Sequence, residues 1–130
     1  MQSRSSLRTP LSRVRGLGSA KSGTDHFFRQ RVTALANVPL AIAFIIIVVS
    51  LQGADHARMT ATLAHPLVAI LLLLFVVSGV IHMRLGMQVI IEDYVHNEGA
   101  KIAMLIANTF FAIIIGAASV FSILKMAFGG

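Results

Sequence analysis

The sequence contains no cysteine and no tryptophan, and charged residues make up only 12% of its 130 residues. Without cysteine, the chain cannot form a disulfide, bind a metal through a thiolate or use a cysteine nucleophile. Soluble domains carry about 25% charged residues, whereas this chain is 56% hydrophobic and has a mean hydropathy of +0.82. These values exclude an ordinary soluble domain and leave any redox chemistry to a bound cofactor.

The formal net charge of +6 is concentrated at the N-terminus. Residues 1–31 hold seven Arg or Lys residues against a single acid, Asp25, and the charges of the remaining residues cancel. No folded nucleic-acid reader accompanies this basic segment, so a nucleic acid is not expected as a partner. Residues 1–24 are predicted to be a basic tail on the cytoplasmic or matrix side, and their composition also fits a mitochondrial transit peptide.

Three long apolar segments follow the tail, within a predicted membrane domain of residues 25–130. The uncharged run 32–51 would cover about 30 Å as a helix, which is the thickness of a bilayer core. Further spans are predicted over about 63–88 and 101–126. The expected fold is therefore an all-α membrane protein, with three transmembrane helices preceded by a basic N-terminal tail.

The basic residues beside the first span predict its orientation, because Lys and Arg resist translocation. The N-terminus and the connector 89–99 are expected on the inner side of the membrane. The connector 52–62 and the C-terminus are then expected on the outer side. Thr24 or Asp25 is the expected cap of the first helix.

His82 is the first candidate for a functional residue. It lies inside the apolar second span, where an imidazole needs either a hydrogen bond to a neighbouring helix or a metal such as a haem iron. Ser78, Gly79 and Gly86 lie one turn away on the same face, which would admit a flat macrocycle or a closely packed helix. His65 is about 25 Å away along the helix and cannot be a second ligand. A haem held by two histidines would therefore take its second ligand from another chain.

Other polar residues lie near the expected inner boundary of the membrane. Arg84, about 200° round the helix from His82, is expected to snorkel to the interface or to meet an anionic group. Asp93 and Tyr94 are expected past the end of the second helix. Tyr94 is either an interfacial belt residue or a hydrogen-bond donor to a quinone carbonyl, with Asp93 beside it. Arg31 either anchors the first span or pairs with an anionic cofactor group such as a haem propionate.

Other function classes lack their motifs. The sequence has no phosphate-binding loop, no nucleophile elbow and no paired carboxylates within a span. The absence of any carboxylate from the span cores disfavours a proton-coupled transporter. A non-catalytic membrane scaffold or assembly protein, in which His82 and Tyr94 are structural, stays an open alternative.

The segment 79–96, GVIHMRLGMQVIIEDYVH, resembles the signature of the hydrophobic membrane anchor subunit of succinate dehydrogenase, respiratory complex II. In that signature a haem-ligand His is followed four residues later by Gly, and eleven and twelve residues later by Asp-Tyr. His82, Gly86, Asp93 and Tyr94 keep this spacing.

The segment 23–40, GTDHFFRQRVTALANVPL, is similar to the start of that family's first span, with Arg31 at the place of a recurring Arg. The tail TPLSRVRGLGSAK looks most like bacterial members related to the mitochondrial lineage. This similarity implies a bacterial cytoplasmic (inner) membrane, with the mitochondrial inner membrane as the alternative.

The resemblance implies a role for each matching residue. His82 would be an axial ligand of the haem b iron, and a companion cytochrome b subunit would supply the other ligand. Gly86 would leave room for the haem, and Arg31 would lie near its propionates. Tyr94 would donate a hydrogen bond to ubiquinone, and Asp93 would support that site.

The resemblance also implies partner chains. FAD would belong to a flavoprotein subunit and the iron–sulfur clusters to an iron–sulfur subunit. This chain would contact membrane lipid and hold both subunits at the membrane surface. Electrons from succinate, in the tricarboxylic acid cycle, would pass through those subunits to ubiquinone in the respiratory chain. The anchor of a fumarate reductase shares these features and stays open.

Overall fold

The computed structural model describes residues 9–15 and 22–128, and this part of the chain is helical with no strand. Its helices are α1 (Pro10–Val14), α2 (Ser22–Ser50), α3 (His56–Leu63), α4 (Pro66–Tyr94) and α5 (Glu98–Phe128). Three of them, α2, α4 and α5, are long and apolar enough to cross a membrane. The prediction of an all-α membrane protein with three spans is confirmed. Most of the predicted basic tail, residues 1–8 and 16–21, lies outside the described residues.

The helix ends differ from the sequence-based expectations. The prediction that Thr24 or Asp25 caps the first helix is wrong, because α2 already begins at Ser22 and Asp25 forms an ion pair of 3.0 Å with Arg29. The connector 52–62 was expected to be a loop, but it holds α3. That helix begins where the Asp55 carboxylate accepts a hydrogen bond of 2.8 Å from the Arg58 amide.

Asp93 and Tyr94 do not lie past the end of the second membrane helix, as expected, but form the end of α4. The helix continues because the amide of Val95 still bonds to the carbonyl of Ile91, at 3.0 Å. The connector to α5 is therefore very short. Asn97 starts α5 by accepting a hydrogen bond of 3.0 Å from the amide of Ala100.

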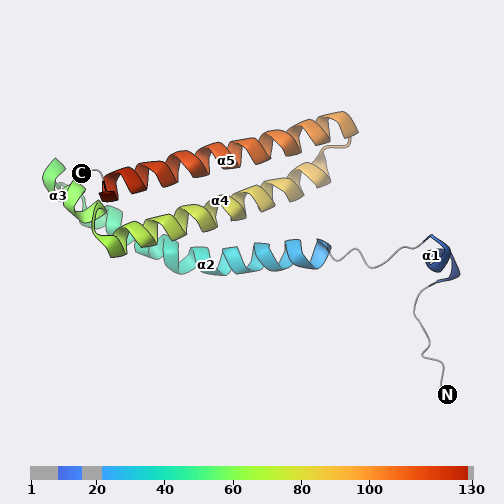
Figure 1. Cartoon of the computed structure of the whole chain (residues 1–130), viewed down its shortest axis with the longest axis horizontal. Coiled ribbons are helices and arrows are strands. Elements are labelled where there is room, and N and C mark those ends of the chain that lie inside the picture. Colours follow the sequence, from blue (N-terminus) through green and yellow to red (C-terminus); the bar gives the residue numbers. More distant parts are fainter. Residues whose placement is uncertain (1–8, 16–21, 129–130) are drawn as a thin grey trace, which may run out of the picture.

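The three membrane helices run antiparallel in a single layer with α4 in the middle (Figure 1). Helix α4 packs against α2 on one side and α5 on the other, and α2 and α5 make no contact with each other within the described residues. Helix α3 contacts α4 and α5 at the end of the layer where α5 finishes (Figure 1). Helix α4 thus has a membrane helix on each side, whereas α2 has one such neighbour only.

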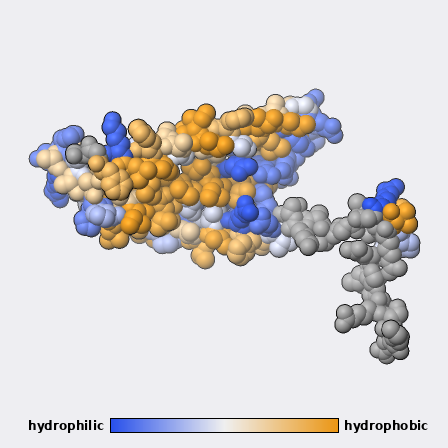
Figure 2. Space-filling model, viewed as in Figure 1, coloured by the Kyte–Doolittle hydropathy of each residue, from blue (hydrophilic) through white to orange (hydrophobic). Residues whose placement is uncertain are grey.

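Few side chains are buried in this layer. The buried hydrophobic residues all belong to α4 and α5, and they are Ala69, Leu72, Leu85, Ile91, Ala112 and Ile123. The visible face of the bundle is hydrophobic along the middle of the long helices and hydrophilic toward both ends (Figure 2). In a membrane such apolar faces are covered by lipid tails or by the helices of other chains.

Candidate functional site

Polar side chains line one face of α2 and meet a polar patch on α4. The residues on α2 are His26, Gln30, Thr33 and Asn37, whose spacing of three and four residues places them on one helical face. The residues on α4 are Ser78 and His82. Thr33 lies 3.2 Å from His82 and Gln30 lies beside Gly86, so this polar face of α2 is turned toward α4. We call these six residues the α2–α4 seam.

His82 is half-buried in the seam and lies next to Thr33. The Nδ1 atom of His82 is 3.2 Å from the hydroxyl oxygen of Thr33. That hydroxyl oxygen is also 2.8 Å from the carbonyl oxygen of Arg29, one helical turn back. The carbonyl oxygen of Gln30 is farther away, at 3.2 Å.

These distances favour one arrangement of the protons. A hydroxyl has one hydrogen and a carbonyl has none, so two oxygens at 2.8 Å must share the hydrogen of Thr33. With that hydrogen directed to the carbonyl of Arg29, Thr33 turns a lone pair toward His82 and accepts a hydrogen from Nδ1, which is the tautomer that this contact favours. In a neutral imidazole the other nitrogen, Nε2, is then unprotonated and offers a lone pair.

Of the small residues around His82, two face α2 and one faces open space. A Cβ atom added to Gly86 would lie 3.5 Å from Nε2 of Gln30, so Gly86 faces α2. Ser78 also faces α2, because its hydroxyl is 3.5 Å from the carbonyl oxygen of Thr33. A Cβ atom added to Gly79 would have no neighbour within 4 Å, so the open space beside His82 is at Gly79.

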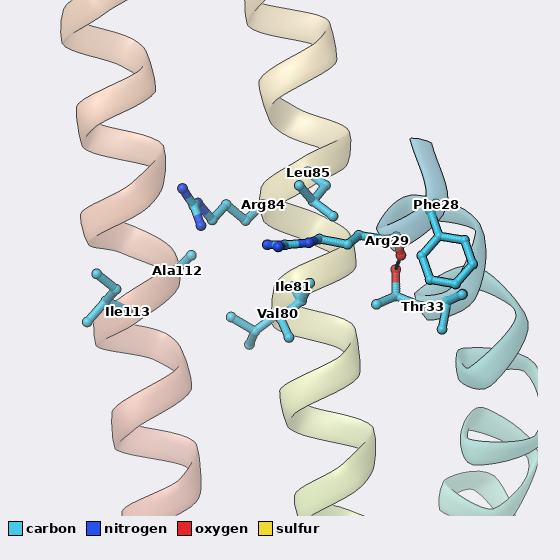
Figure 3. Close-up of a pocket in the computed structure, with 10 residues that line it drawn as sticks. Phe28, Arg29, Thr33, Val80, Ile81, Arg84, Leu85, Ala112 and Ile113 are labelled. Carbon is cyan, nitrogen blue, oxygen red and sulfur yellow. Dashed lines mark hydrogen bonds between the residues drawn. The ribbon is translucent and has the colours of Figure 1, made fainter. Parts of the chain in front are cut away.

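A cavity of about 560 Å³ lies between α2, α4 and α5. Its walls are apolar except for Thr33 and two basic side chains, Arg29 and Arg84, which extend into the same space (Figure 3). Arg29 is paired with Asp25, whereas the guanidinium of Arg84 has no hydrogen-bond or ion-pair partner in the described part of the chain. His82 does not line this cavity, in keeping with its position about 200° round the helix from Arg84.

Arg31 lies away from His82. Its guanidinium is stacked on the ring of Phe27, 5.1 Å from the ring centre. It is two positions before Thr33 and so points to roughly the opposite side of α2. The structure therefore does not bring Arg31 to His82, and Arg29 is the basic residue of α2 that shares a cavity with Thr33.

Tyr94 and Asp93 are at the exposed end of α4. The side chain of Tyr94 is 78% exposed, and its hydroxyl has no hydrogen-bond partner in the described residues. Twelve positions separate it from His82, about 18 Å along the helix. Tyr94 and His82 thus form two separate places on one helix.

Sequence reasoning missed Thr33 and Arg29 as residues of the site. The signal for Thr33 was present in the spacing of His26, Gln30, Thr33 and Asn37, which places polar side chains on one face of the helix that leads into the apolar run 32–51. Only the packing of α2 on α4 shows which of these residues meets His82.

The geometry agrees with a comparison to known families. The sequence model of the succinate dehydrogenase/fumarate reductase transmembrane subunit matches residues 5–116. The chain belongs to this family. The resemblance found in the sequence is thereby confirmed.

Individual relatives in this family are bacterial. The chain is 32% identical to the succinate dehydrogenase hydrophobic membrane anchor subunit of Paracoccus denitrificans, over 93% of both chains. It is also 32% identical to the subunit of the same name from Rickettsia bellii, over 83% of this chain and 86% of the relative. No solved structure matches it. The three spans and the bacterial relatives fit a bacterial inner-membrane protein.

Proposed function

We propose that this chain is the membrane anchor subunit of a succinate dehydrogenase, that His82 binds the iron of haem b and that Tyr94 contacts ubiquinone. The soluble flavoprotein and iron–sulfur subunits, with their FAD and iron–sulfur clusters, would be held at the inner face of the membrane by this chain and a companion cytochrome b subunit. Ubiquinone is the substrate, and the anchor itself does not oxidise succinate.

The observation that carries the haem assignment is the hydrogen bond between His82 and Thr33. It occupies Nδ1 and leaves the lone pair of Nε2 free, which is the form of imidazole that binds iron. Among the described residues no group of three or more His, Asp or Glu side chains could hold a bare metal ion. A single histidine suits haem, whose macrocycle supplies four nitrogens of its own. Bound at His82, haem b would supply a one-electron redox centre inside the membrane.

The open space at Gly79 supports the same assignment. Gly79 is one turn before His82, and nothing in the described structure fills the volume that a side chain would take there. The predicted role of Gly86 in admitting the haem stays a prediction, because Gly86 faces Gln30. The predicted contact of Arg31 with a propionate also stays a prediction, and Arg29 and Arg84 are further basic candidates.

We expect Tyr94 to serve a quinone at the inner interface. Its exposed phenol can donate a hydrogen bond to a carbonyl oxygen, and the neighbouring carboxylate of Asp93 can hold a water or a basic side chain and help to deliver protons. Quinone head groups lie near the membrane boundary because they are polar and their tails are apolar. The end of the candidate span α4 is expected at that boundary.

An optical spectrum of the intact complex tests the haem assignment. The complex would be purified from its native membrane in mild detergent through a tag on this chain, and its dithionite-reduced minus oxidised spectrum recorded. We expect a b-type signal in the wild type and its loss in His82→Ala. His65→Ala is the matched control, because His65 caps α4 at the other end of the helix, and it should keep the signal.

Two outcomes would contradict the assignment. An intact complex without a b-type signal would leave an anchor that contains no haem. A b-type signal that persists in His82→Ala would place the ligand elsewhere.

A further inference from the structure

The side chain of Thr33 is held by a hydrogen bond within its own helix and also contacts His82. Its hydroxyl donates to the carbonyl of Arg29 at 2.8 Å, within α2. The oxygen keeps its lone pairs as acceptors, and one of them is directed across the helix contact toward Nδ1 of His82 at 3.2 Å. An imidazole that donates to such an acceptor is held both in its tautomer and in the rotation of its ring.

No other described side chain makes a hydrogen bond to His82. Three other polar atoms of the seam do not bond to His82. They are buried without a partner in the described structure, and they are Oε1 of Gln30, Oδ1 of Asn37 and Nε2 of His26. Among the residues that the structure describes, Thr33 is thus the one hydrogen-bonding group that orients the ring. It also lines the cavity between the three helices, so a smaller side chain at this place would enlarge that cavity.

We propose that Thr33 is a positioning residue for haem b: it keeps the hydrogen on Nδ1 of His82, directs Nε2 to the iron and sets the plane of the ring. This inference rests on the proposed function, because it takes His82 as the iron ligand. Hydrogen bonding at Nδ1 makes Nε2 a stronger electron donor, which favours ferric over ferrous iron. The hydroxyl of Thr33 should therefore lower the reduction potential of the haem.

The test replaces the hydroxyl with a methyl group of nearly the same size. In the purified complex, Thr33→Val should raise the midpoint potential of the b haem, because Nε2 becomes a weaker donor. A tenfold change in the ratio of ferric to ferrous affinity corresponds to about 59 mV for one electron. The ferric electron paramagnetic resonance spectrum should also shift or broaden, since the low-field g value reports the relative planes of the two axial ligands.

Three further variants separate positioning from packing. Thr33→Ser keeps the hydroxyl and should restore the wild-type potential and spectrum. Thr109→Val makes the same chemical change on α5, where the hydroxyl bonds to the carbonyl of Leu105 at 3.0 Å, and should change neither. Thr33→Ala provides a second variant without the hydroxyl if Thr33→Val does not assemble.

The outcomes distinguish this inference from the proposed function. Loss of the b-type signal in His82→Ala, together with wild-type potentials and resonance spectra in Thr33→Val and Thr33→Ala, would overturn the role of Thr33 and leave His82 as the ligand. A complex without haem, or one that keeps haem in His82→Ala, would overturn the proposed function itself. Equal shifts in Thr33→Val and Thr33→Ser would assign the effect to packing and so contradict the role of the hydroxyl.

Discussion

Tyr94 differs from other polar residues of α4 because its hydroxyl makes no hydrogen bond within the described structure and can bind another molecule. His82 is held by Thr33, and Gln88 donates a hydrogen bond of 2.8 Å to Glu92. Tyr94 has an exposed side chain at the helix end and no hydrogen-bond partner for its hydroxyl among the described residues. Its phenol is thus available to a quinone or to a partner subunit.

Tyr94→Phe tests the quinone role at the level of a single atom. It removes the phenol oxygen and keeps the aromatic ring, so an interfacial belt residue would be little affected. Loss of a hydrogen bond worth about 0.5–1.5 kcal/mol should reduce kcat/KM for ubiquinone roughly two- to tenfold. Reduction of an artificial dye by the soluble subunits should be unchanged and serves as the control. Unchanged quinone turnover would count against a contact between Tyr94 and ubiquinone.

The two helix contacts of α4 are built from different interactions. Toward α5 the contact is close and apolar: a Cβ atom on Gly116 would lie 3.4 Å from a methyl group of Val80. Within the described residues one hydrogen bond crosses this contact, from the side-chain amide of Asn108 to the backbone carbonyl of Arg84, at 3.0 Å. Toward α2 the contact is the polar seam, although Phe44 and Phe75 stack farther along it, with ring centres 4.9 Å apart.

A pair of matched substitutions tests this difference. Asn108→Leu removes a satisfied hydrogen bond and should destabilise the complex by about 0.6 kcal/mol, the average for such bonds between membrane helices. Asn37→Leu removes Oδ1, which is buried without a partner in the described structure, and should be neutral or stabilising. Both would be measured as the thermal midpoint of dissociation of the detergent-solubilised complex. If Asn37→Leu proved the more damaging change, Asn37 would have a partner in the assembled complex.

The three membrane helices form a single layer rather than a closed bundle. Helix α2 has one neighbour and no buried residue among those described, and hydrophobic side chains cover the outer faces. A layer of this kind is completed by lipid and by helices of other chains. This shape agrees with a subunit that shares its cofactor with a companion subunit.

The orientation of the layer is a prediction for the whole molecule. We expect the connector before α3 to face outward and the connector between α4 and α5 to face inward, because basic residues precede α2. Since the chain has no cysteine, Gln52→Cys and His96→Cys each introduce a single thiol. A membrane-impermeant maleimide should label Gln52→Cys in spheroplasts and His96→Cys in inverted vesicles, with the unaltered subunit as the background control. The reverse pattern would show that the layer is inserted the other way.

The sequence by itself determined the fold class and the family. Uncharged runs long enough to cross a bilayer can only be helices there, because the lipid offers no partner to an unpaired backbone group. Spacing along one helix is fixed by its geometry, so His82, Gly86, Asp93 and Tyr94 could be placed relative to one another from the sequence. The helix ends were less accurate, because capping by Asp55, His65 and Asn97 depends on local hydrogen bonds that compete closely.

Only the tertiary structure decided which residues of different helices meet. In a membrane, packed and lipid-facing surfaces are both apolar, so hydrophobic periodicity cannot show which face of α2 is turned toward α4. The packing brings Thr33 rather than Arg31 to His82, and Arg29 rather than Arg31 to the cavity that Arg84 lines. The tautomer of His82 that this contact favours likewise depends on the direction of a lone pair on another helix.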